Sequence, residues 1–153
     1  MKFLEQPRSL NNPLLKNLMR FLIVVIALAL LSDILLHNYK IGLSPSQATQ
    51  TIAGNEEEFC EPMLFDSLLE QVHTDTLNSM ISLLLLAVIL IRLNPTSKQR
   101  SIHLAFISAI STQIVLLVSF YFSAFILLWI ILFVLWHLTA LSMAIESLWR
   151  LSK

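Results

Sequence analysis

The sequence predicts an all-α membrane protein, a bundle of four transmembrane helices with a partly helical loop on its outer side. Of its 153 residues, 56% are hydrophobic and 13% are charged, whereas a soluble domain of ordinary composition has about 25% charged residues. The apolar residues form stretches long enough to cross a bilayer, which takes about 20 residues. The basic residues gather on one side of these stretches, a bias that sets the orientation of membrane proteins.

The first two predicted spans cover residues 18–36 and 77–93. The first span is interrupted only by Arg20 near its start and Asp33 near its end. The second span is short for a bilayer crossing. We expect it to continue from a helix that begins near Pro62, because proline fits the first turn of a helix.

The third and fourth predicted spans form a helical hairpin. The stretch between Arg100 and Glu146 has 45 residues and contains no Asp, Glu, Lys or Arg. At about 1.5 Å per residue, a helix of that length is roughly twice as long as the bilayer is thick. We therefore expect two spans over residues 102–120 and 124–145, joined by a tight turn at residues 119–123.

Charge predicts which way the bundle faces. Nine of the ten basic residues lie on the side that holds both ends of the chain, and only Lys40 lies on the other side. The nine are Lys2, Arg8, Lys16, Arg20, Arg92, Lys98, Arg100, Arg150 and Lys153. Because basic segments stay on the cytoplasmic side, we expect both termini to be cytoplasmic and the chain to lie in a bacterial inner membrane.

The outer loop, residues 37–72, contains one predicted helix over residues 45–53. Ser44 is suited to begin this helix as its N-cap, and Gly54 is suited to end it. The loop is too small to form its own core, since units below about 40 residues usually need disulfides, a metal or a partner. We therefore expect a metal or a neighbouring protein to order it, and the acidic run 56–58 suits a basic partner surface.

Three segments around this loop resemble a known group of proteins. They are residues 37–44 (HNYKIGLS), 53–57 (AGNEE) and 65–73 (FDSLLEQVH). They are similar to small four-helix inner-membrane proteins of bacteria, in which a Leu-Leu-Glu-x-x-His motif begins the second span. A second histidine often follows two residues later in such proteins, and Asp75 occupies that position here. The resemblance implies four spans and no particular activity.

Five titratable residues near the outer ends of the first two spans are the candidate metal ligands. Asp33 and His37 are four residues apart and share one helix face, and Glu70 and His73 are three apart and share another. A Glu-x-x-His pair on a helix is the ligand arrangement of di-iron carboxylate bundles. With Asp75, this set predicts a site for a divalent metal such as Zn, Cu or Fe. The alternative is that these residues bind no metal and are ordinary polar side chains exposed to water at the membrane interface.

The histidines also allow the hypothesis that the protein binds a haem, with His37 and His73 at matching depth as ligands of one iron. His137 is the deepest titratable residue of the predicted bundle. Buried polar residues in membrane spans usually face the bundle interior. We expect the imidazole of His137 to form a hydrogen bond with a neighbouring helix, for instance with Gln113 or Ser111.

The function that these features favour is a non-catalytic one. We expect an accessory or scaffold subunit of a bacterial inner-membrane complex, which contacts lipid and either other membrane subunits or further copies of itself. The first alternative is a metal-binding membrane protein, and the second is a small b-type haem protein. We assign no catalytic residue and expect no nucleic-acid partner. The role of the single cysteine, Cys60, stays open.

Overall fold

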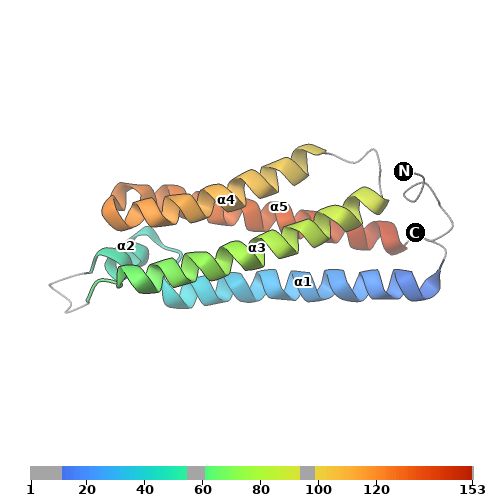
Figure 1. Ribbon diagram of the computed structural model, residues 1–153, viewed down its shortest axis with the longest axis horizontal. Coiled ribbons are helices and arrows are strands. Elements are labelled where there is room, and N and C mark those ends of the chain that lie inside the picture. Colours follow the sequence, from blue (N-terminus) through green and yellow to red (C-terminus); the bar gives the residue numbers. More distant parts are fainter. Residues whose placement is uncertain (1–11, 55–60, 94–98, 153) are drawn as a thin grey trace.

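The computed structural model describes residues 12–54, 61–93 and 99–152, and these residues form a bundle of four long helices with one short helix at its end (Figure 1). The prediction of an all-α fold is confirmed, and no strand occurs in the described ranges. The acidic run 56–58 and Cys60 lie outside the described residues. The helices are α1 (Pro13–Lys40), α2 (Pro45–Ala53), α3 (Phe65–Leu93), α4 (Gln99–Tyr121) and α5 (Ile126–Ser152).

Four of these helices are long and apolar enough to cross a membrane, as predicted. The 28 residues of α1 extend over about 42 Å at 1.5 Å per residue, more than the roughly 30 Å of the hydrocarbon layer. Large apolar side chains such as Phe21, Ile107 and Leu138 are more than half exposed on the outward faces. Such a surface suits lipid.

Helices α1 and α4 extend beyond their predicted spans at both ends, α3 extends at its start and α5 at its end, because polar residues there continue the helix. Pro13 occupies the first position of α1, and the side chain of Asn12 accepts a hydrogen bond from the backbone N–H of Leu14 at 3.0 Å. This N-cap satisfies a backbone donor that the helix itself leaves free. The hairpin of α4 and α5 turns through a short 3₁₀ helix, Ser123–Phe125.

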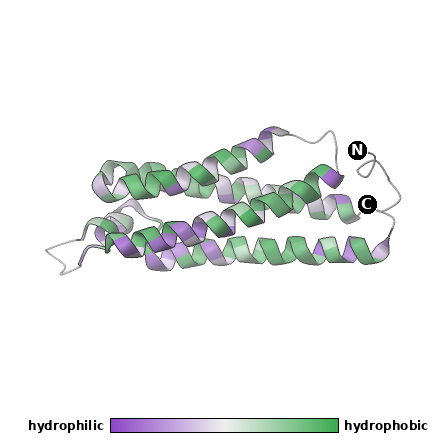
Figure 2. Cartoon of the chain, in the orientation of Figure 1, coloured by the Kyte–Doolittle hydropathy of each residue, from purple (hydrophilic) through white to green (hydrophobic). Residues whose placement is uncertain are grey.

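Helix α5 is the centre of the bundle and packs against α1, α3 and α4. Helices α1 and α3 lie next to each other but make few contacts with one another. We call the end that carries α2 the α2 end, and the end where α1 begins and α5 finishes the terminal end. Figure 2 shows that hydrophilic residues gather on the halves of α1 and α3 nearest the α2 end.

The short helix α2 has the boundaries that its capping residues predict. The side chain of Ser44 accepts a hydrogen bond from the backbone N–H of Gln47 at 3.3 Å. Gly54 ends the helix with a φ of 79°, a value that glycine adopts without the strain of a side chain.

The α2 segment packs against the bundle itself, which supplies apolar contacts for this part of the loop. Ile41, Ala48 and Ile52 are almost fully buried. They belong to one apolar cluster with Leu68 of α3 and Trp129 of α5. The loop was too small for a core of its own, but it completes the core of the bundle instead.

Candidate functional site

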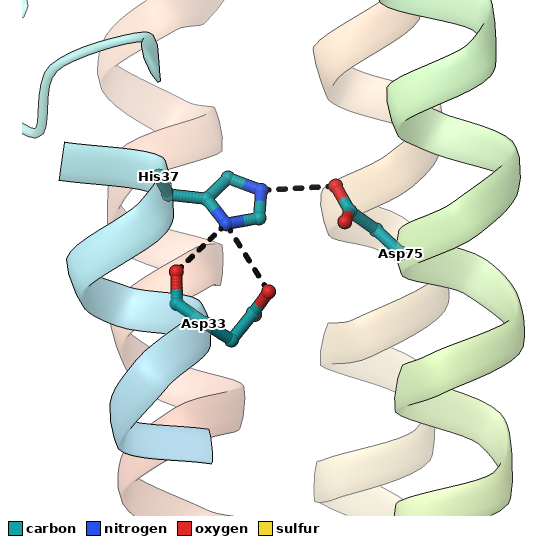
Figure 3. A group of neighbouring side chains, drawn as sticks. All are labelled: Asp33, His37 and Asp75. Carbon is teal, nitrogen blue, oxygen red and sulfur yellow. Dashed lines mark hydrogen bonds and ion pairs between the residues drawn. The ribbon is translucent and has the colours of Figure 1, made fainter. Parts of the chain in front are cut away.

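A cluster of four titratable side chains lies inside the bundle near the α2 end. Helix α1 supplies Asp33 and His37, α3 supplies Asp75, and α5 supplies His137. Asp33 is seven residues from the end of α1, which places it about 10 Å below that end at 1.5 Å per residue. Figure 3 shows the side chain of His37 reaching across from α1 to α3.

His37 is bonded through both ring nitrogens. Its Nδ1 lies 3.0 Å from the backbone carbonyl oxygen of Asp33 and 3.4 Å from the Oδ1 of the same residue. Its Nε2 lies 2.9 Å from Oδ2 of Asp75. Because a carbonyl oxygen only accepts, Nδ1 carries a hydrogen and donates it. Nε2 is the nitrogen that faces the carboxylate of Asp75. The residue is only 2% exposed.

His137 repeats this arrangement on α5. Its Nδ1 donates to the backbone carbonyl oxygen of Phe133 at 2.9 Å, and its Nε2 lies 3.0 Å from Oδ2 of Asp33. The expected partners, Gln113 and Ser111, were wrong. They belong to α4, whereas His137 faces α1, where a carboxylate is a stronger acceptor than an amide or a hydroxyl.

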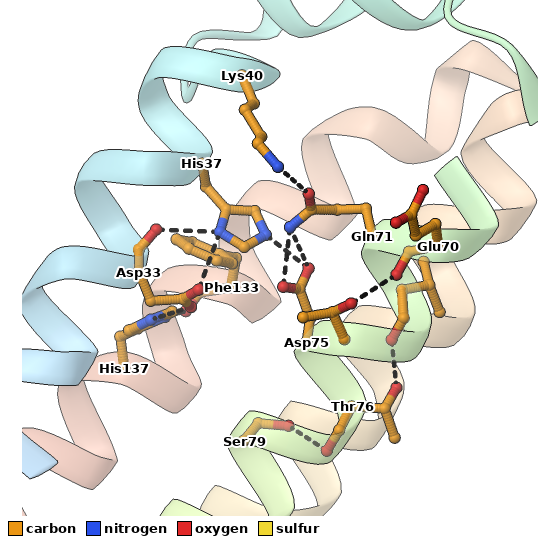
Figure 4. A network of polar contacts seen from close by, with 12 residues as sticks. Asp33, His37, Lys40, Glu70, Gln71, Asp75, Thr76, Ser79, Phe133 and His137 are labelled. Atoms are coloured by element: carbon orange, nitrogen blue, oxygen red, sulfur yellow. Dashed lines mark hydrogen bonds and ion pairs between the residues drawn. The ribbon is translucent and has the colours of Figure 1, made fainter. Parts of the chain in front are cut away.

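The cluster continues to the surface as one chain of hydrogen bonds (Figure 4). Gln71 Nε2 donates to both carboxylate oxygens of Asp75, at 2.8 and 3.0 Å. Lys40 Nζ donates to Oε1 of Gln71 at 2.9 Å. Side-chain hydrogen bonds therefore join α1 to α3, through His37 and Asp75, and α1 to α5, through Asp33 and His137.

Each of the two imidazole–carboxylate pairs has no net charge. Each Nε2–Oδ2 contact, His37 with Asp75 and His137 with Asp33, is bridged by one hydrogen. Whether that hydrogen sits on nitrogen or on oxygen, the two side chains of the pair have no net charge together. A neutral set of four titratable groups is tolerated within a membrane, where an isolated charge is costly.

Aromatic side chains of α5 pack against both imidazoles. The ring centroid of Phe133 lies 4.6 Å from that of His37 and 4.2 Å from that of His137. Trp136 lies closer still to His137, at 3.7 Å between centroids. These rings fix the orientation of the imidazoles and separate them from lipid on the α5 side.

Two cavities meet at the carboxylates of Asp33 and Asp75, which line both of them. The first has a volume of about 380 Å³ and extends from these carboxylates toward the α2 end. Its other polar lining residues are Lys40, Ser67, Glu70, Gln71, Thr74 and Asn78. The side chain of Asp33 is 23% exposed. The cluster is therefore reachable from the α2 end of the bundle.

The structure brings three of the five predicted metal ligands together. One ligand atom from each of Asp33, His37 and Asp75 lies within 4.8 Å of the others. Glu70 and His73 are exposed and do not join this group in the described part of the chain. His73 stands about 200° around the helix from Asp75, since successive residues are about 100° apart, and the two side chains point to opposite sides of α3.

The haem hypothesis required His37 and His73 to face one iron. The structure does not bring them together, because His73 is exposed on the other side of α3 and Nε2 of His37 faces Asp75. Conversely, the sequence analysis missed His137 as a member of the cluster. Comparing the depths of His137 and Asp33 in the membrane would have identified His137 as a member. His137 lies 13 residues before Arg150, or about 20 Å from the terminal end, which leaves about 10 Å of the bilayer on the other side. Asp33 lies the same 13 residues from Arg20, a basic residue on the same side, and therefore at about the same depth.

Together, the fold and the buried Asp/His cluster define a four-span helical membrane protein. Residues 42–153 match the family model of a transmembrane helical domain, and the chain belongs to this family. The match includes Asp75 and His137, whereas α1, which carries Asp33 and His37, lies before it. No curated protein and no solved structure matches the chain.

Proposed function

We propose that this membrane protein binds a divalent metal cation at Asp33, His37 and Asp75. The observation that carries the proposal is the convergence of one ligand atom from each of these residues within 4.8 Å, at a cavity that opens toward the α2 end. The imidazole of His37 is also held as metal-binding histidines usually are, with its second nitrogen donating to a backbone carbonyl.

The donor set determines which cations fit. Two carboxylates and one imidazole suit Zn, Fe or Mn, and suit Cu less well than a site with more nitrogen or sulfur. Metal–ligand bonds of about 2.0–2.2 Å keep two ligand atoms of one ion no more than about 4.4 Å apart. A small rotation of one carboxylate therefore closes the site, and the adjoining cavity leaves the remaining coordination positions to water.

A titration with matched controls tests this proposal. Protein purified in detergent and stripped with a chelator is titrated with Zn²⁺ and Mn²⁺ by calorimetry. Asp75→Asn and His37→Gln should each weaken binding at least about tenfold, because each removes a ligand. Asp66→Asn and His73→Gln, which alter exposed residues of α3 that do not line either cavity, should change it less than about threefold. Absence of binding to the unaltered protein, or equal loss in both sets, contradicts the proposal.

We further propose that the α2 end faces away from the cytoplasm of a bacterial cell, with both termini in the cytoplasm. The distribution of basic residues supports this orientation, since Lys40 is the only one near the α2 end. In a Cys60→Ser background, Gly54→Cys should react with a membrane-impermeant maleimide added to intact cells. A reporter fused after Lys153 should be active only if it works in the cytoplasm. The reverse pattern contradicts the orientation.

A second candidate function is that of an accessory or scaffold subunit in a membrane assembly. A specific observation favours it, namely a polar surface on the outward side of α1 and α3, within the membrane-spanning part of both helices. Ser32 and Asn78 are exposed on this surface. Polar side chains at such positions are the groups through which membrane helices associate.

A further inference from the structure

The second of the two cavities lies between α1 and α3 and extends from the carboxylates toward the terminal end. It has a volume of about 390 Å³. Its lining includes Ala29, Ser32, Asn78, Ser79, Ser82 and Trp136. Asn78 is 13 residues from the start of α3, so it lies about 20 Å along that helix. This polar groove is therefore well inside the membrane-spanning part of the bundle.

Several polar groups of the groove have no partner within the described residues. The side chains of Asn78 and Ser82 form no hydrogen bond there. Trp136 is only 2% exposed, and its indole Nε1 is buried without an acceptor. Hydrocarbon offers no hydrogen-bond partner, and each polar group left unpaired there is costly. The Nε1 of Trp136 is out of reach of an occupant, but the accessible side chains of Asn78 and Ser82 favour one that offers hydrogen-bond donors and acceptors.

We propose that the occupant is a second copy of this chain, which docks through the same α1–α3 groove. An amide or a hydroxyl both donates and accepts hydrogen bonds. Asn78, Ser32 and Ser82 can therefore bond to their own counterparts across a twofold axis, as an isologous interface requires. A surface of charged groups of one sign would repel its own copy. Ala29 and the serines are also small enough for two helices to approach closely.

The outward faces of the other two long helices have a different character. Ile107 and Ile114 of α4 and Ile131 and Leu138 of α5 are each more than half exposed. Lipid covers such side chains at no cost. These helices therefore supply control positions at which association is not expected.

Association through the groove is independent of cation binding, although Asp33 and Asp75 line both cavities. The groove residues that carry it are neutral. A dimer should therefore form equally with chelator and with added Zn²⁺. If the protein binds no cation, the proposal of a dimer is unaffected. If the protein is monomeric, the proposal of a cation site is unaffected.

Cysteine cross-linking in native membranes tests the proposal. In a Cys60→Ser background, Asn78→Cys and Ser82→Cys should each give a disulfide-linked dimer of this chain under mild oxidation. Ile107→Cys and Leu138→Cys should give at least tenfold less. Cross-linking at equal rates at all four positions overturns the proposal, as does a product formed only with a different protein.

A second measurement does not depend on introduced cysteines. The double variant Asn78→Leu/Ser82→Leu removes the polar groups that pair across the interface, and it should lower the dimer fraction in lipid nanodiscs at least tenfold. The matched change Ile107→Leu/Ile114→Leu should leave that fraction unchanged. Circular dichroism identifies the folded variants, and Asn78→Ala/Ser82→Ala replaces the Leu pair if the larger side chains prevent folding. An unaltered dimer fraction in the folded groove variant overturns the proposal.

Discussion

The contact between His37 and Asp75 is the most direct test of how the buried cluster holds the bundle together. Asp75→Ala removes the acceptor of His37 Nε2 at 2.9 Å and of Gln71 Nε2 at 2.8 and 3.0 Å. His37 and Asp75 are 2% and 5% exposed, and no other side chain accepts from His37 Nε2 in the described residues. A buried polar group left unpaired costs about 1–3 kcal/mol. Gln71 is only half-buried and can turn to solvent. We therefore expect a loss of about 1–3 kcal/mol in the free energy of unfolding.

A double-mutant cycle isolates the pair from these other losses. His37→Ala, Asp75→Ala and the double variant are unfolded with SDS in mixed micelles and chelator, and unfolding is followed by tryptophan fluorescence. Interhelical hydrogen bonds in membranes couple by about 0.6 kcal/mol on average and by up to about 1.7 kcal/mol. The short, buried contact here should lie at the upper end, between about 1 and 2 kcal/mol. The exposed pair Glu70 and His73 is the control cycle and should couple by less than about 0.5 kcal/mol. Equal coupling in both cycles refutes the reasoning.

Two further predictions concern the fold. Gly42 has a φ of +89°, and a Cβ built there would lie 2.6 Å from Cβ of Gln47, so Gly42→Ala should cost more than about 1 kcal/mol and speed hydrogen exchange in α2. Normal exchange in that variant would contradict the geometry. Leu83 is fully buried and Leu84 is 55% exposed, so Leu83→Ala should cost about 2–5 kcal/mol in the same unfolding assay. Leu84→Ala should cost less than about 1 kcal/mol, because lipid fills the space; similar losses for both would contradict the assigned packing.

The number of spans and the boundaries of α2 could be predicted because local rules determine them. A helix must be long and apolar to cross the bilayer, and Ser44 and Gly54 cap α2 through contacts within a few residues. How the α2 segment packs could not be predicted. Its burial depends on Leu68 and Trp129, which are distant in the sequence. The sequence analysis compared the loop with an isolated unit and therefore expected an external partner.

The site could be predicted only in part, because some of its contacts are local and others join residues distant in the sequence. Asp33 and His37 lie one turn apart on one helix, so their proximity follows from helical geometry alone. The choice between Asp75 and His73 depends on which face of α3 points inward. The sequence does not reveal that face, because polar residues lie on all sides of α3 at this level, from Glu70 to Thr76. His137 required a comparison of depth between two helices, and the sequence analysis compared histidines only with histidines.

Stability alone does not account for two Asp and two His residues in this position, and a quadruple replacement tests that argument. A single change leaves a buried partner unpaired, whereas replacing all four by leucine leaves none. The cavities of about 380 and 390 Å³ beside Asp33 and Asp75 provide room for the larger side chains. The variant Asp33→Leu/His37→Leu/Asp75→Leu/His137→Leu should therefore unfold within about 2 kcal/mol of the unaltered protein, since apolar replacement of buried ion pairs is often neutral. It should bind no Zn²⁺ in the calorimetric titration. If it is instead less stable than Asp75→Ala in the SDS assay, the cluster is mainly a structural link between α1, α3 and α5. If it is as stable as expected, the four residues are dispensable for folding, and their presence within the membrane calls for a chemical role.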